Sequence, residues 1–169
     1  MKKRGQIGVE VVIYTLIALS LIGAVLAFTI PKIEEIRDRA VIEQSVVMME
    51  NIDNKISSLS LVPGNKRVVD ITIKKVTFII SGENNSIKFE MESEFVYSEP
   101  GTEINLAGNL VALTEKVGSA NKVTLTRTFN NYDLTYNNEN STKLLSQSPT
   151  PYKLSIENRG NSVINFAVS

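Results

Sequence analysis

Glu10 is the only charged side chain in an apolar run that extends from Ile7 to Ile30. A carboxylate inside such a run costs a few kcal/mol or more in lipid unless it is protonated or paired with a cation. The run itself contains no cation. Glu10 therefore needs a protonated state or a positively charged partner from outside its own helix, and charge neutralisation is the chemistry that its position suggests.

The Gly5-Gln6 peptide bond is the second chemical feature, because it separates the basic cluster Lys2–Arg4 from the apolar run. A secretory signal is cut after its apolar stretch, which is about 7–15 residues long. The run here is longer, and residues 25–28 offer no convincing Ala-x-Ala site. The small-residue break beside the basic cluster instead precedes the run, at Gly5.

This order of basic cluster, Gly5-Gln6 junction, Glu10 and long apolar helix resembles the class III signal peptide of archaeal type IV prepilins. The resemblance covers residues 1–30 and little else, and it departs from the family at Gly8, where many members have serine. It implies that a membrane-embedded prepilin peptidase cuts between Gly5 and Gln6 on the cytoplasmic side. It also implies that the apolar helix stays on the mature chain.

Such a cut would free an α-amino group at Gln6, whose pKa of about 7.7–8 leaves it largely cationic near neutral pH. In a filament of staggered helices, Glu10 of one subunit would then neutralise Gln6 of its neighbour. Removing one partner of a buried pair of this kind costs about 3–5 kcal/mol. The alternative is that Glu10 lies at the headgroup level of a plain membrane anchor and is solvated there.

The apolar run is long enough to cross a bilayer, because about 20 helical residues match a hydrocarbon core of about 30 Å. Basic residues ahead of it place the rest of the chain outside the cytoplasm. Small residues within the run allow helices to approach closely in lipid. These candidate packing positions are Ser20, Gly23, Ala24 and Ala27.

Beyond the run, helical periodicity predicts that the helix continues to Val62 and ends at Pro63-Gly64-Asn65. The predicted inward stripe is Ile33, Ile36, Ala40, Ile42, Ser45, Met49, Ile52, Ile56 and Leu59. Charged residues of the segment 34–39, Asp38 among them, are assigned to the opposite face. We expect the stripe to pack on the protein's own sheet rather than on another chain.

From Arg67 the apolar period changes to two, which predicts strands. The alternating sets are Val69, Ile71 and Ile73; Val76, Phe78 and Ile80; Ile87, Phe89, Met91, Phe95 and Tyr97; Val123, Leu125 and Phe129; Tyr152, Leu154 and Ile156. The phase slips at Lys74-Lys75, which predicts a bulge or an edge bend. Residues 104–117 stay ambiguous between strands and a short helix.

The sequence of the C-terminal part of the chain predicts one long polar surface segment and one hairpin. Residues 130–151 are rich in Asn, Ser and Thr and read as a long surface segment with one strand at 132–136. The chain then forms a hairpin that turns at residues 158–161 and returns over 162–168. The predicted fold class is α+β: a long N-terminal helix with a C-terminal antiparallel β-sheet or small β-sandwich head of about five to seven strands.

Composition argues against an enzyme, since the chain has no Cys, His or Trp and shows no local nucleophile or phosphate-loop motif. We expect no cofactor and no metal, because carboxylates at 90, 92 and 94 on one strand do not converge as calcium ligands. Eighteen basic residues balance eighteen acidic ones, so nucleic-acid binding has no electrostatic support. Asn84 and Asn140 are candidate N-glycosylation sites in predicted loops.

The resemblance thus implies an archaeal pilin-like structural subunit, major or minor, that assembles into a surface filament for adhesion or a related task. Its expected parts are a leader (1–5), a transmembrane and filament-core helix (6–30), a helix continuation that packs on the head (31–62) and a β-rich extracellular head domain (67–169). Its expected partners are prepilin peptidase, membrane lipid and other pilins. The alternatives are a monomeric single-span binding protein and an archaellum or pseudopilus component.

Overall fold

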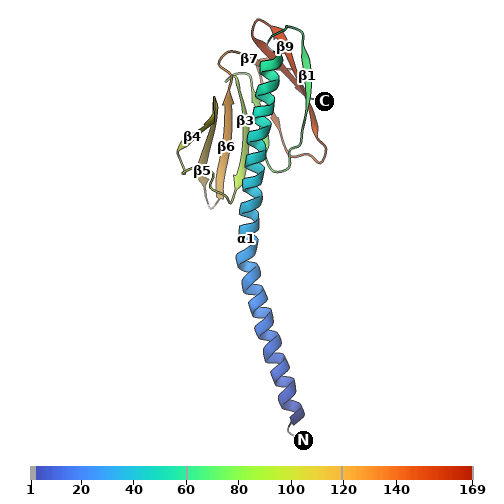
Figure 1. The fold of residues 1–169 in the computed structure, drawn as a ribbon, viewed down its shortest axis with the longest axis vertical. Helices are drawn as coiled ribbons and strands as arrows, with labels where there is room; N and C mark the ends of the chain where they lie inside the picture. Colours follow the sequence, from blue (N-terminus) through green and yellow to red (C-terminus); the bar gives the residue numbers. More distant parts are fainter. Residues whose placement is uncertain (1–2, 60, 119, 169) are drawn as a thin grey trace. The chain divides into compact units, whose positions relative to one another are not determined.

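The computed structural model describes residues 3–59, 61–118 and 120–168, and for residues 3–7 it describes the backbone alone. The chain divides into two compact units, Met1–Arg37 and Asp38–Ser169. One helix, α1 (Lys3–Leu59), begins in the first unit and ends in the second (Figure 1). Ten strands follow it in the described part of the chain, which confirms the predicted α+β class.

The helix continues through Pro31 and ends at Leu59, three residues before the predicted end. The Leu59 carbonyl oxygen accepts hydrogen bonds from the backbone N–H of Val62 at 3.3 Å and from Asn158 Nδ2 at 2.9 Å. Gly64 follows with a φ of 85°, a left-handed conformation that suits glycine. A side chain from the C-terminal hairpin therefore satisfies the last turn of the helix.

The strands form two sheets. The four-stranded sheet has the order β1-β9-β10-β7 and consists of β1 (Lys66–Ile71), β9 (Tyr152–Gly160), β10 (Val163–Val168) and β7 (Asp133–Tyr136). The six-stranded sheet has the order β4-β5-β6-β3-β2-β8 and consists of β4 (Glu103–Ala107), β5 (Leu110–Val117), β6 (Ala120–Thr128), β3 (Ser86–Ser93), β2 (Thr77–Ser81) and β8 (Thr142–Leu145). The strand pairs are antiparallel except β10 with β7, which is parallel.

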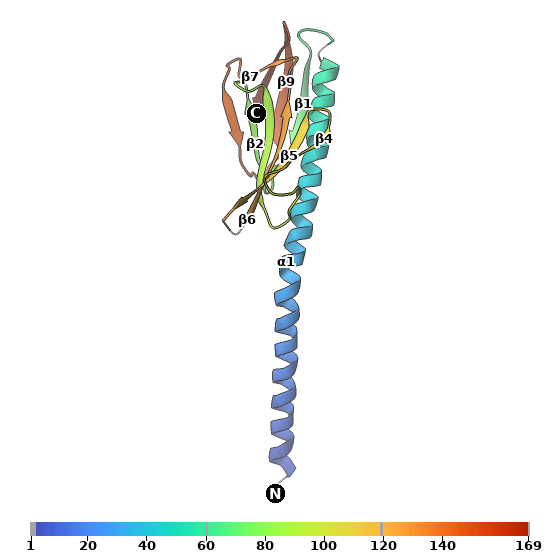
Figure 2. The ribbon, with the colours of Figure 1, turned by 90° about the vertical axis from the view of Figure 1, so that its left-hand side faces the viewer.

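One core joins the helix to both sheets, and Figures 1 and 2 both show the later part of α1 running alongside the strands. The helix contributes the buried side chains Ile42, Met49, Ile52, Ile56 and Leu59, and Ser45 is buried with them. The stripe over 42–59 is therefore confirmed. The prediction was wrong for Ile33, Ile36 and Ala40, which are exposed.

Inward strand faces agree with the predicted alternation for Phe78, Phe89 and Leu125, which are buried. The slip at Lys74-Lys75 is not a bulge, because the chain leaves the four-stranded sheet after Ile71 and enters the six-stranded sheet at Thr77. The predicted bulge was therefore wrong, whereas a bend is present at Lys74-Lys75, after the edge strand β1.

Several shorter elements differ from the prediction. Residues 104–117 form the β4–β5 hairpin, and the polar surface segment at 130–151 holds two strands, β7 and β8, instead of one. Phe95 and Tyr97 lie beyond the end of β3, half-buried against the core. The last hairpin turns at Asn161-Ser162, because β9 continues through residues 158–160. The strand count of five to seven was too low.

Candidate functional site

The apolar segment of α1 has no partner within the described chain. Every residue from Gly8 to Phe28 is exposed. Large apolar side chains along it keep about half or more of their surface accessible, as in Val9 (60%), Leu19 (62%) and Phe28 (74%). By length and composition this helix could cross a membrane, and its most apolar stretch is not buried at all. An exposed apolar surface of this extent is typical of segments that contact lipid or other proteins.

The serine and threonine hydroxyl groups of the apolar run are satisfied by the helix itself. Thr15, Ser20 and Thr29 each donate a hydrogen bond to the backbone carbonyl four residues earlier, at 2.8 Å for Ser20 and Thr29. A hydroxyl bonded in this way carries little cost into lipid, because its donor is already paired. The charged group of this segment is the carboxylate of Glu10.

Glu10 is exposed and has no ion-pair partner among the side chains that the structure describes. The backbone of Gly5 and Gln6 belongs to α1, and their side chains lie outside the described residues. The predicted cleavage at their junction and the pairing of Gln6 with Glu10 both stay predictions. The structure leaves the Glu10 carboxylate accessible to a partner from another molecule.

The four small residues of the helix, Ser20, Gly23, Ala24 and Ala27, are all exposed. A methyl group built on Gly23 would meet no atom within 4 Å. These residues therefore serve no close packing within the described chain, and their use in helix association stays a prediction.

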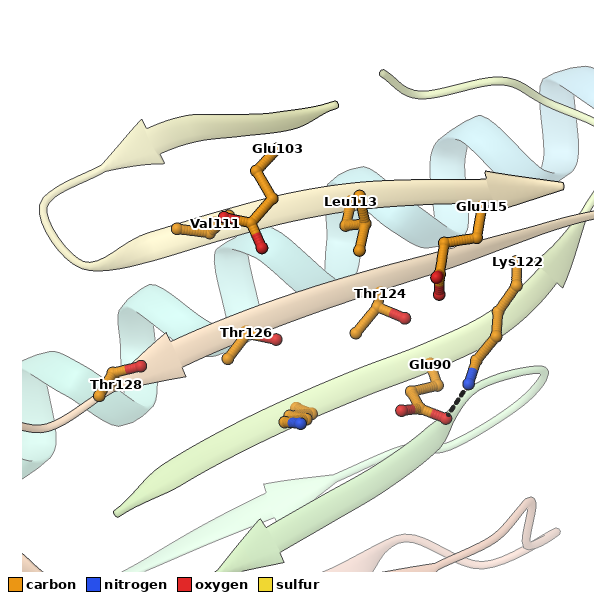
Figure 3. A pocket seen from close by; sticks show the side chains of 10 residues that line it. Glu90, Glu103, Val111, Leu113, Glu115, Lys122, Thr124, Thr126 and Thr128 are labelled. Carbon is orange, nitrogen blue, oxygen red and sulfur yellow. Dashed lines mark ion pairs between the residues drawn. The ribbon is translucent and has the colours of Figure 1, made fainter. Parts of the chain in front are cut away.

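The outer face of the six-stranded sheet carries a depression of about 420 Å³. Figure 3 shows Thr124, Thr126 and Thr128 in a row along β6, with Lys122 reaching across to Glu90. The Lys122 Nζ to Glu90 Oε2 distance is 2.8 Å. The described residues include no group of three or more His, Cys, Asp or Glu side chains that could hold a metal ion. The hydroxyl, carboxylate and ammonium groups of this face can hydrogen-bond to a partner.

The two candidate glycosylation residues are both exposed and lie on neighbouring turns. Asn84 belongs to the turn between β2 and β3, and Asn140 precedes β8. Gly82 connects these turns, because its backbone N–H donates to the Ser141 carbonyl oxygen at 3.1 Å.

Asp38 was assigned to the solvent face of the helix, and that assignment was wrong, because its side chain is fully buried. Its carboxylate pairs with Lys75 and accepts a hydrogen bond from the backbone N–H of Glu94 at 2.8 Å. The signal was present in the sequence, since Asp38 lies four residues before Ile42, in phase with the buried stripe.

A second ion pair joins the helix to β6. Arg127 Nη2 lies 2.5 Å from Asp53 Oδ2, and Arg127 Nη1 donates to the Ala107 carbonyl oxygen at 3.0 Å. Arg127 occupies an inward position of β6 between Leu125 and Phe129, so it interrupts the apolar alternation there. Both pairs fix the helix on the sheets.

Tyr97 is the one described group with a clear change in acidity. Its ring is half-buried, and burial is the main reason that its pKa is raised above 10.0. The carboxylate of Glu43 raises the pKa further, whereas Arg39 lowers it. Arg39 also lies over the Phe95 ring, 5.7 Å from its centroid. These groups line the contact between α1 and the segment after β3.

Comparison of the chain with models of protein families, with curated proteins and with solved structures finds no match.

Proposed function

We propose that this chain is a pilin-like structural subunit of a cell-surface filament, held first in the membrane and then in the filament core by the apolar segment of α1. The observation that carries the proposal is the contrast between the two units. The second unit has a core of its own, whereas residues 8–28 expose apolar side chains throughout. A neighbouring copy of the same segment would cover this surface, as lipid does before assembly.

Glu10 supports assembly over simple anchoring. Its carboxylate is the one charged group of residues 7–30, and a free amine at Gln6 of a neighbouring subunit would neutralise it. Processing by a prepilin peptidase between Gly5 and Gln6 would supply that amine. The pair would fix the stagger between subunits more than it would stabilise them.

The N-terminus of the native protein tests this proposal directly. Intact-mass measurement of protein from its own cells should show loss of residues 1–5 with the apolar helix retained. A chain that still begins at Met1, or that begins after Ala27, would contradict the proposal.

Filament yield tests the assembly step itself. Glu10→Gln should leave the protein cleaved and inserted in the membrane but reduce its recovery in sheared surface filaments, because a neighbour's amine loses its counter-charge. Val12→Leu is the matched control in the same helical turn and should assemble normally. Recovery of Glu10→Gln in filaments at the same normal level as Val12→Leu would refute the proposed role of Glu10.

A monomeric membrane-anchored binding protein is the second candidate, and the depression on the outer face of the six-stranded sheet favours it (Figure 3). That function needs no contact between apolar helices. Wild-type protein found in the membrane fraction alone, with none in sheared filaments, would support this candidate over a filament subunit.

A further inference from the structure

The two Asn-x-Ser/Thr sequons of the chain meet at one corner of the six-stranded sheet. Their hydroxyl residues are Ser86 in β3 and Thr142 in β8, and both strands pair with β2. Ser81 of β2 stands opposite Ser86 on one side and opposite Thr142 on the other. Two sequons that lie 56 positions apart in the sequence, at Asn84 and Asn140, are therefore neighbours in the fold.

Packing at this corner is close. A methyl group built on Gly82 would lie 2.6 Å from Asn140 Oδ1 and 2.8 Å from the Leu134 carbonyl oxygen. The Thr142 hydroxyl hydrogen-bonds to Ser81 Oγ at 3.3 Å. The backbone on which both sequons depend is thus fixed in the folded chain.

The two sequons differ in the accessibility of their asparagine amide and of their hydroxyl group. Asn84 Nδ2, the atom that would carry a saccharide, donates to Ser81 Oγ at 3.3 Å. The hydroxyl residue of the same sequon, Ser86, is 2% exposed, and its Oγ has no hydrogen-bond partner in the structure. A transferase that reads this hydroxyl could reach it only before β2 and β3 pair.

The residues of the second sequon are more accessible than those of the first. Asn140 and Thr142 are both exposed, and Asn140 lies in the turn that leads into β8. An enzyme can reach the exposed residues of this sequon without opening a strand pair, and its hydroxyl has only to release the hydrogen bond to Ser81 Oγ.

We propose that Asn140 carries an N-linked saccharide, added to the folded second unit, and that Asn84 stays unmodified. In this step a membrane oligosaccharyltransferase takes the saccharide from a lipid-phosphate-linked donor. A bond forms between Asn140 Nδ2 and the anomeric carbon, the bond from that carbon to the phosphate oxygen breaks, and the phosphate keeps the electron pair. The amide loses one proton, which passes to water. The proposal needs residues 38–169 to lie outside the cytoplasm, but it does not need a filament.

A saccharide at this position would also protect the sheet. In the described chain β8 pairs with β2 alone, so its other edge is open, and Leu144 on it is 58% exposed. Open edges invite pairing with strands of other molecules. A hydrated saccharide just before β8 would hinder that approach.

Glycopeptide and intact-mass analysis of full-length protein from membranes of its own cells tests the proposal. Wild type and Asn84→Gln should each carry one saccharide, whereas Asn140→Gln and Thr142→Ala should carry none. Thr142→Ser keeps the sequon and is the matched control, so it should retain the modification.

An unmodified wild-type chain, or a saccharide on Asn84, would overturn the proposal. Modification of Asn84 in the Asn140→Gln variant would show that transfer precedes β2–β3 pairing, and it would overturn the assignment of the step to folded protein. Because the membrane fraction suffices for the measurement, its outcome is independent of filament formation.

Discussion

Neutralising Lys75 should destabilise the second unit more than neutralising Asp38, although the two residues form one ion pair. The Asp38 side chain is fully buried, whereas that of Lys75 is 43% exposed. Lys75→Met leaves a buried carboxylate with the Glu94 N–H as its remaining partner. Asp38→Asn keeps an acceptor for that N–H, and the freed ammonium of Lys75 can turn to water.

The magnitudes follow from this asymmetry. Removing one partner from a buried pair costs about 3–5 kcal/mol when the other charge cannot be solvated, which applies to Lys75→Met. Asp38→Asn replaces a charge-assisted hydrogen bond by a neutral one and should cost about 1–2 kcal/mol. The double variant removes both charges and should be more stable than Lys75→Met alone.

Guanidinium unfolding of the full-length protein in detergent, followed by tyrosine fluorescence, measures these free energies. Lys74→Met is the matched control, because Lys74 is exposed and should change stability by less than about 0.5 kcal/mol. A Lys75→Met variant as stable as Asp38→Asn, or a double variant that is less stable than Lys75→Met, would refute the reasoning.

Three further predictions concern other parts of the chain. Gly23→Leu should reduce filament recovery without changing membrane insertion, because it places a bulky side chain on the small-residue face; unchanged filaments would argue against that face. Asn158→Ala should lower the free energy of unfolding by about 1–3 kcal/mol, since it leaves the Leu59 carbonyl without its side-chain donor; unfolding curves that coincide with wild type would contradict this. Below pH 10 the raised pKa of Tyr97 contributes stability that is lost as the pH rises through that pKa, so Tyr97→Phe should lose less stability than wild type between pH 9 and alkaline unfolding; parallel pH profiles would count against it.

The sequence predicted the features that depend on local periodicity. The helical stripe from Ile42 to Leu59 and the inward face of β3 through Phe89 were found because apolar spacing reports burial directly. The strand at 132–136 was found as β7, whereas the four-residue edge strand β8 was missed because it is too short to show alternation.

Features that depend on distant partners could not be found in this way. Asp38 is buried because Lys75 meets it from 37 positions away, and the slip at residues 74–75 marks a change of sheet that no local pattern specifies. For the candidate site, hydropathy alone identified the apolar helix and Glu10. The neighbouring position of the two sequons follows from strand pairing and was not visible in the sequence.

The link between Asn158 and the end of α1 has a consequence for the order of folding. The hydrogen bond to the Leu59 carbonyl joins residues 99 positions apart, and β1 completes its ladder only with β9. Contacts this distant in sequence form slowly, because a long loop must close before they contribute. The four-stranded sheet therefore cannot assemble until residues 152–168 have been synthesised. Until then the buried stripe of α1, from Ile42 to Leu59, is incompletely covered. If residues 38–169 are exported while the chain is being synthesised, they would cross the membrane in a loosely folded state. The second unit would then complete its fold only on the far side.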